Sequence, residues 1–258
     1  MAISPTCSSE IGRRSIVENR TPLSRHQSID CLARVGLCGI LAVIAVTPIQ
    51  ARSDVLEELG CAGCHQLEPI PRAERTLARF AARKGPDLFY AGSKYRPEWL
   101  RSWLADPKPI RPAGIRPFEL TSSSETGDVL AAAPAPHPTV PSNRIGSVVS
   151  ALESRDWGSE LLPNPAPAPA QVPRMLAELN FVKFKGCGSC HRTTASGPPL
   201  SGPDLMDGWS RLQPAFLAAY IANPQNWDPV APMPGYALQP IEVGKLMEYL
   251  RLLSQEAR

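Results

Sequence analysis

The chain lacks an excess of charge of either sign, and it lacks a long hydrophobic run. Its 27 Lys and Arg residues nearly balance its 24 Asp and Glu residues, and no basic run resembles a patch that follows nucleic-acid phosphates. We therefore expect no nucleic-acid partner. The apolar stretch at 35–46 is well short of the roughly 20 residues that span a bilayer. With 43% apolar and 20% charged residues, the composition excludes a collagen-like or wholly disordered chain, and 258 residues suffice for about two domains.

The apolar stretch at 35–46 has the features of an export signal. Arginines precede it, and the following residues end at Ala51, a small residue that suits a cleavage site. We predict that residues 1–51 form a signal cleaved after about Ala51, which places the mature chain in the periplasm or another extracytoplasmic space. The alternative is an uncleaved leader that anchors the protein to the membrane through residues 35–51.

The cysteines form a pattern that carries chemistry. Three of the seven lie in the leader, and the other four form two Cys-x-x-Cys-His motifs. This motif is the attachment signature of c-type haem, in which two thiols form thioethers with the porphyrin and the histidine binds the iron. A zinc knuckle needs four ligands at closed-site spacing, and a redox pair does not need the histidine. We predict two covalently bound haem c groups. The residues that hold them are Cys61, Cys64 and His65 in the first motif, and Cys187, Cys190 and His191 in the second.

An internal repeat follows the two motifs. The segment 85–88 (GPDL) recurs at 202–205, an offset of 117 residues, and 11 of the 34 positions from 85 to 118 are identical at that offset. The motifs themselves are 126 residues apart, so the first copy carries nine extra residues between His65 and Gly85. Internal similarity of this kind predicts two domains with one plan.

Apolar spacing within the repeat predicts a helix in each copy. Residues 97–104 carry pairs of Trp and Leu one helical turn apart, and residues 214–221 repeat the pattern with Phe, Tyr, Leu and Ile. Each helix begins at a proline and should end before the next one, at Asp106 and at Asn223. We interpret the aromatic side chains as core residues that line the haem crevices.

Further helices are predicted at the ends of the second copy. Leu176, Leu179 and Val182 have helical spacing before the second motif, and a longer apolar stripe at 243–253 closes the copy. The alternating Pro and Ala residues at 163–173 favour an extended, semi-rigid polyproline II spacer between the copies.

The closing helix of the first copy has two candidate positions. The gapless repeat would place it at 124–133, whereas residues 145–152 carry a better apolar stripe, with Ser142 or Asn143 available as the N-cap. We predict the helix at the second position, with residues 119–141 as an insertion.

Together, these features resemble the class I cytochrome c family in a tandem dihaem form. The resemblance rests on two Cys-x-x-Cys-His motifs, each followed by Gly-Pro-Asp-Leu, an aromatic-leucine helix and an Asp-Pro or Asn-Pro stop. It implies an all-α fold. Two small cytochrome c-like helical domains, at 52–156 and 172–258, would be joined by a Pro-rich linker at 157–171, after the N-terminal signal or anchor at 1–51.

The resemblance also implies a partner for each proximal histidine. In this family the proline carbonyl of the Gly-Pro-x-Leu segment accepts a hydrogen bond from the second ring nitrogen of the histidine. That role falls to Pro86 for His65 and to Pro203 for His191. Such a bond fixes the orientation of the imidazole and raises its basicity.

The two copies differ at the position of the sixth iron ligand. The resemblance implies a methionine in a Met-Pro loop, which the second copy supplies as Met233, and a His/Met pair raises the reduction potential. The first copy has Arg116 at the aligned position, and a guanidinium has no lone pair for iron. Three alternatives follow for the first haem: His137 as the distal ligand, an open position, or another side chain such as Lys94.

Two functions fit the sequence. The first is an exported dihaem electron carrier that transfers single electrons between redox proteins of a respiratory chain, or within a membrane oxidase or dehydrogenase complex. The second is a haem enzyme or sensor, in which an open first haem binds a small ligand beside Arg116 and the second haem exchanges electrons. Because no catalytic constellation accompanies the motifs, electron transfer is the leading prediction and no residue is assigned a catalytic role.

Overall fold

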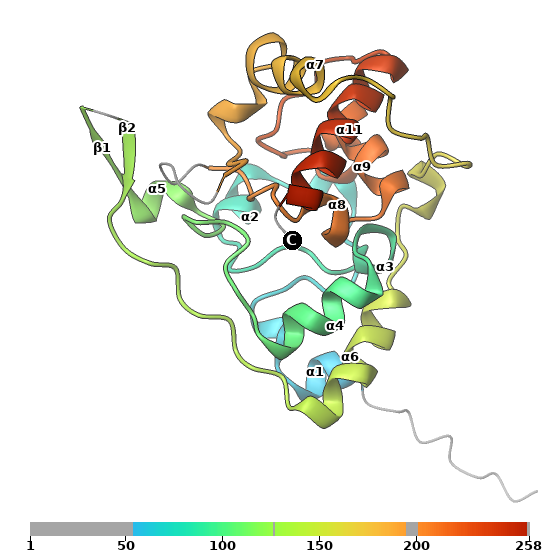
Figure 1. The fold of residues 1–258 in the computed structure, drawn as a ribbon. Coiled ribbons are helices and arrows are strands. Elements are labelled where there is room, and N and C mark those ends of the chain that lie inside the picture. Colours follow the sequence, from blue (N-terminus) through green and yellow to red (C-terminus); the bar gives the residue numbers. More distant parts are fainter. Residues whose placement is uncertain (1–53, 126, 195–200, 257–258) are drawn as a thin grey trace, which may run out of the picture. The chain divides into compact units, whose positions relative to one another are not determined.

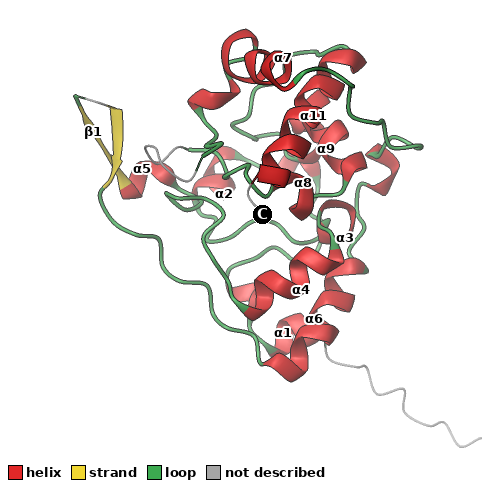
Figure 2. Ribbon diagram, in the orientation of Figure 1, coloured by secondary structure: helices red, strands yellow, loops and turns green. Residues whose placement is uncertain are grey.

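The structure, a computed structural model, describes residues 54–125, 127–194 and 201–256. The predicted leader, with its cleavage site and its anchor, lies outside these residues. Within the described part of the chain, no helix is long and apolar enough to cross a membrane. The fold is mostly helical, with one two-stranded hairpin that projects from its side (Figure 1, Figure 2).

The first copy is built from short helices and turns. α4 (Pro97–Ala105) and α6 (Ile145–Glu153) pack on each other, and α1 (Val55–Glu58) packs on α6. The other elements are η1 (Cys61–Gly63), η2 (Arg72–Glu74), α2 (Leu77–Ala81), α3 (Ala91–Lys94), α5 (Pro117–Leu120), β1 (Thr121–Ser124), β2 (Gly127–Leu130), η3 (Ser142–Arg144) and η4 (Ser159–Leu161).

The second copy is organised around its last helix, α11 (Pro240–Glu256). This helix contacts α7 (Arg174–Leu179), α8 (Gly208–Arg211) and α9 (Pro214–Ala222), and it buries the whole stripe predicted at 243–253. The remaining elements are the π-helical turn η5 (Asn180–Phe184), the 3-10 turn η6 (Cys187–Ser189) and α10 (Pro224–Trp227).

The helices predicted within the repeat are confirmed. α4 and α9 both begin at a proline, where the missing N–H costs no intrahelical bond, and they end before Asp106-Pro107 and Asn223-Pro224. The leucines of α4 are buried, and α9 buries Phe216, Leu217, Ala218 and Ile221, so each helix contributes to the core.

The closing helix of the first copy also lies where the stronger apolar stripe predicts it. α6 buries Ile145, Val148, Val149 and Leu152, and the alternative region contains the hairpin of β1 and β2 instead of a helix. The predicted cap is wrong, because Ser142 and Asn143 belong to the preceding 3-10 turn η3 and no side chain caps α6.

The buried face of α7 differs from the predicted one. The helix forms before the second motif, but Leu176 and Val182 are exposed, whereas Ala177 and Phe181 are buried. At 180–184 the chain forms a wider π-helical turn, in which backbone hydrogen bonds join residues five positions apart rather than four. Regular helical spacing therefore selects the wrong side.

The two copies meet in a contact that repeats itself under the offset of 117 residues. Tyr95 and Leu212, which are equivalent positions, form an antiparallel bridge. On one side of the bridge, Arg96 N donates to Arg211 O (2.9 Å). On the other, Gln213 N donates to Lys94 O (2.9 Å). Each bond is the counterpart of the other, so the backbone pairing has the symmetry of an isologous dimer interface.

This contact around Tyr95 and Leu212 is called the pseudo-twofold contact here, and two long side chains extend it. Arg96 Nε donates to the carbonyl oxygens of Trp209 (3.2 Å) and Leu212 (3.0 Å). The equivalent residue, Gln213, donates through Nε2 to Tyr95 O (3.2 Å) and also to Gly92 O. Because Trp209 and Leu212 are the counterparts of Gly92 and Tyr95, an arginine and a glutamine perform the same task on opposite sides.

An aromatic cluster fills the contact between the copies. Tyr90 of the first copy stacks on Phe216 of the second (ring centroids 6.2 Å apart) and lies 5.6 Å from Trp227. Trp157, from the segment predicted as the start of the linker, packs edge-on against Phe89 at 5.2 Å. These residues belong to one continuous hydrophobic core.

The predicted linker is attached to both copies at its ends. Trp157 lies in the shared core, and Ala170 N donates to Gly244 O in α11 (2.9 Å). The described residues, from 54 to 256 with their two gaps, belong to one compact unit. The two copies are therefore in direct contact, in addition to their connection through the proline-rich segment.

Candidate functional site

Both Cys-x-x-Cys-His motifs fold as one tight turn. In each, a 3-10 turn follows a glycine in the left-handed region, Gly60 (φ 73°) and Gly186 (φ 64°). The backbone N–H of His65 donates to Cys61 O (2.9 Å), and that of His191 to Cys187 O (3.1 Å). The sequence analysis missed these two glycines, although one precedes each motif, and their conformation sets the direction in which the turn begins.

The four cysteines of the motifs are free thiols. The first cysteine of each pair is half-buried and the second is exposed, and burial raises the pKa of Cys61 and of Cys187 above the ordinary thiol value. Among the described residues, no three His, Cys, Asp or Glu side chains converge to hold a metal ion by themselves. The motifs thus offer two thiols and one imidazole each, which is the donor set that haem attachment uses.

Both motif histidines make the hydrogen bond that the resemblance implies. His65 Nδ1 lies 2.7 Å from Pro86 O, and His191 Nδ1 lies 2.9 Å from Pro203 O. Burial lowers the pKa of both imidazoles, which favours the neutral form. With Nδ1 bonded to a carbonyl, Nε2 keeps the lone pair that a metal needs.

A glycine presses against each of these rings. A Cβ at Gly85 would lie 2.5 Å from His65 Cε1, and a Cβ at Gly202 would lie 2.6 Å from His191 Nδ1 and 2.5 Å from Cys190 O. Only glycine lets the backbone pass so close to the imidazole. The Gly-Pro pair therefore supports the ring by contact and by hydrogen bond, and the residues of both motifs fit a covalently attached haem with an axial histidine.

His137 lies next to His65. Their ring centroids are 6.1 Å apart with an interplanar angle of 45°, although the two residues are 72 positions apart in the chain. Trp103 of α4 packs edge-on against the His137 ring (4.8 Å), and His137 Nδ1 lies 2.7 Å from Pro138 O. The segment predicted as an insertion thus returns its histidine to the first motif, with Nε2 free of that hydrogen bond.

The two other residues considered for the first haem are engaged elsewhere. Arg116 pairs with Glu119 (2.9 Å) at the start of α5. The ammonium of Lys94 lies over the rings of Tyr95 (4.9 Å), Tyr90 (5.4 Å) and Phe216 (5.7 Å), within the contact between the copies. Of the three side chains, only His137 makes a ring contact with His65.

Met233 lies in the loop between α10 and α11, and its side chain is half-buried. Gln225 of α10 fixes this loop, because its Nε2 donates to Met233 O (2.8 Å) and to Ala231 O (3.4 Å). The loop is therefore held from the helix that precedes it.

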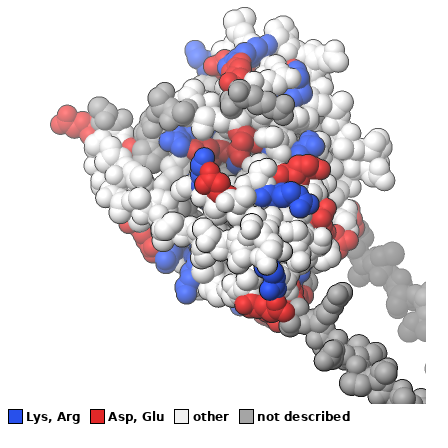
Figure 3. Space-filling model, turned by 60° about the horizontal axis from the view of Figure 1, so that its bottom comes forward, with Lys and Arg blue, Asp and Glu red and all other residues white. Residues whose placement is uncertain are grey.

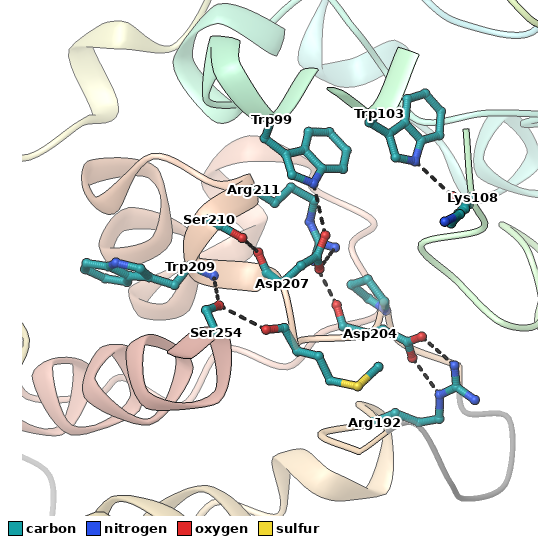
Figure 4. Close-up of polar contacts among 12 residues, drawn as sticks. Trp99, Trp103, Lys108, Arg192, Asp204, Asp207, Trp209, Ser210, Arg211 and Ser254 are labelled. Atoms are coloured by element: carbon teal, nitrogen blue, oxygen red, sulfur yellow. Dashed lines mark hydrogen bonds and ion pairs between the residues drawn. The ribbon is translucent and has the colours of Figure 1, made fainter. Parts of the chain in front are cut away.

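A polar network surrounds the second Gly-Pro-Asp-Leu segment (Figure 4). Arg192, directly after His191, makes a two-pronged ion pair with Asp204, directly after Pro203. Trp99 of the first copy donates through Nε1 to Asp207 (3.1 Å), which also pairs with Arg211. The support of His191 is thus tied both to its own motif and to the other copy.

Charge is mixed on the face of the molecule seen in Figure 3. Basic and acidic side chains alternate there, with no field of one sign. Surface charge on this face therefore gives little steering toward a partner of either sign.

Comparison with known proteins gives no relative. No family model matches the chain, and neither a curated protein nor a solved structure is similar to it.

Proposed function

We propose that this chain is an exported dihaem c-type cytochrome that transfers single electrons between redox partners of a respiratory chain. One observation carries the proposal. In both copies a cysteine pair and a histidine share one turn, and the Nδ1 atom of that histidine lies on the carbonyl of the Gly-Pro segment. The haem groups would supply the one-electron chemistry, and the chain would set their potentials through axial ligands and burial.

The first haem would be held by His65 and His137. The ring centroids of His65 and His137 lie 6.1 Å apart, so the two imidazoles are close enough for both to bind one iron. For the second haem, His191 and Met233 are assigned, because Met233 is the methionine of the loop that follows α10.

The assignment favours a carrier over an enzyme or sensor. An enzyme of the kind considered needs an open first haem with Arg116 beside it. In the structure Arg116 pairs instead with Glu119, and the ring of His137 lies near that of His65. Two axial ligands of unlike chemistry, His/His and His/Met, would give the haems different potentials, which suits passage of an electron in one direction. Partners would be redox proteins, or a membrane oxidase or dehydrogenase complex, that dock transiently.

Spectroscopy of the exported protein tests the proposal. We expect two covalent haems by mass spectrometry, both low-spin, and no carbon monoxide binding to the ferrous protein. The variant Met233→Ala should lose the sulfur-to-iron charge-transfer band, and His137→Ala should convert one haem to a high-spin form that binds carbon monoxide. Met175→Ala is the matched control, because Met175 is 71% exposed. Exported protein without covalent haem contradicts the proposal, and an unaltered spectrum of His137→Ala contradicts the bis-histidine assignment.

A further inference from the structure

The segment with the nine extra residues of the first copy reaches across to the second copy. Three arginines from residues 68–84 donate to α10 or to the residue after it. Together they are called the arginine clamp here: Arg72, Arg75 and Arg83. Their acceptors lie between the aromatic helix of the second copy and Met233.

The first arm of the arginine clamp is linked to the backbone of Met233. Arg72 Nη1 donates to Gln225 O (3.0 Å), and the side chain of Gln225 donates to Met233 O (2.8 Å). Two hydrogen bonds in series therefore link the first copy to the loop that contains Met233.

The second arm is buried. Arg75 is 5% exposed, and its Nη1 donates to Trp227 O (3.0 Å). Its guanidinium lies over the rings of Trp157 (4.4 Å) and Phe89 (4.9 Å). A buried guanidinium in contact with two aromatic rings has little freedom to move, so its hydrogen bond holds the carbonyl group of Trp227 in place.

The third arm joins the supports of both haem sites. Arg83 bonds Asp228 Oδ2 (2.6 Å) and Asp87 Oδ2 (2.9 Å), and all three side chains are less than 20% exposed. Asp228 Oδ1 accepts from Val230 N (3.2 Å), which shapes the turn toward Met233. Asp87 directly follows Pro86, the acceptor for the His65 ring.

We propose that Arg83, assisted by Arg72 and Arg75, is a positioning residue that holds Met233 in place for the second iron and couples its loop to the proximal support of the first. This inference rests on the proposed function. A thioether is a weak, neutral ligand, so its hold on iron depends on how well the loop is preorganised. Loosening the loop lets other ligands, such as lysines that lose their proton at high pH, compete at lower pH.

The test uses the full holoprotein with Arg83→Gln, and the readouts are the sulfur-to-iron band as a function of pH and the reduction potential of each haem. We expect the band to disappear at a pH about one unit lower than in the wild type, which is a tenfold change in the proton concentration at the midpoint. The reduction potential of the second haem should also be lower. Arg83→Lys should lose the band at a pH between those of the wild type and of Arg83→Gln, because an ammonium cannot bridge two carboxylates as a guanidinium does.

A matched control and a second variant separate positioning from general destabilisation. Arg79→Gln removes an exposed arginine of the same segment that donates to Gln66 within its own copy (2.9 Å), and it should titrate like the wild type. Asp228→Asn breaks the same link from the other side and should shift the band as Arg83→Gln does. If both variants titrate like Arg79→Gln, the inference is overturned while the haem assignment stands. If the wild type itself shows no such band, the assignment of Met233 fails first, and this inference with it.

Discussion

At the scale of single residues, the candidate sites depend on the absence of a side chain as much as on the presence of one. Gly85 and Gly202 leave room for the rings of His65 and His191, and the prolines that follow accept the ring hydrogen bonds. The motif residues and the prolines could be predicted from the sequence and the family it resembles. The steric role of the glycines could not, because a contact between a missing Cβ and a ring 20 or 11 residues away has no sequence pattern of its own.

The variant Gly85→Ala tests this contact. The added methyl would lie 2.5 Å from His65 Cε1, so the ring must turn and weaken its bond to Pro86. We expect a loss of about 1–3 kcal/mol in the free energy of unfolding, as for other overpacked sites, and an altered spectrum of the first haem only.

Gly63→Ala provides the control for that variant. Gly63 lies inside the first motif, and a Cβ there has nothing within 4 Å. Equal behaviour of the two variants, in denaturant unfolding and in the spectrum, would show that the approach of Gly85 to His65 is unimportant.

At the scale of elements, the sequence predicts helices well where one period holds along their whole length. α4, α6, α9 and α11 lie where apolar spacing and proline place them. The failures occur where the period changes. The π-helical turn after α7 shifts the buried face to Ala177 and Phe181, and the turn η3 displaces the expected cap of α6. Neither change leaves a mark in the spacing of apolar residues.

A small cap illustrates how an element depends on pH. The Asp54 carboxylate accepts a hydrogen bond from Leu56 N (3.0 Å) at the start of α1 and pairs with Arg155. The backbone bond first, and Arg155 after it, lower the pKa of Asp54 below its usual value, against the opposing effect of burial. Because the folded-state pKa is the lower one, Asp54 stabilises the fold above pH of about 4, and the contribution is lost as the pH falls through the folded-state pKa.

We therefore expect Asp54→Ala to lower the free energy of unfolding by about 1 kcal/mol at pH 7, and by progressively less as the pH is lowered. Thermal unfolding at a series of pH values measures the difference from the wild type. Glu57→Gln, at an exposed residue of the same helix, is the control. A constant difference between Asp54→Ala and wild type down to pH 2 would rule out the cap as its cause.

At the scale of the whole molecule, the main result is the pseudo-twofold contact between the copies. The offset of 117 residues is visible in the sequence and predicts that the copies share one plan. It does not predict that the equivalent segments around Tyr95 and Leu212 pair with each other, because those residues read as helix-flanking positions within each copy. The contact between the copies leaves no separate signal in the sequence either, because the apolar residues that join the copies are indistinguishable from ordinary core residues.

The contact should make the two copies unfold together. Arg96→Ala removes two charge-assisted hydrogen bonds to the second copy and leaves two carbonyl groups without that donor, so we expect a loss of about 2 kcal/mol. Gln213→Ala, its symmetry mate, should act in the same direction, and the two losses should not add, because both variants weaken one bridge. Arg101→Ala, an exposed arginine of α4, is the control.

Denaturant unfolding followed separately by tryptophan fluorescence and by the absorption of each haem checks this prediction. A single shared transition in the wild type is expected. Two well-separated transitions in the wild type would show that the copies are independent and that the contact contributes little.

The pseudo-twofold contact has a consequence for mass action. A surface that pairs with its own structural equivalent, when both partners lie on one chain, forms its contact at an effective concentration on the order of millimolar, whatever the amount of protein. The proline-rich segment at 163–173 keeps the two equivalents in reach, with Ala170 already bonded to α11. If the chain were cut within that segment, the same surfaces would associate only at comparable protein concentrations. Covalent connection thus keeps the two copies paired at any dilution, where separate chains would dissociate.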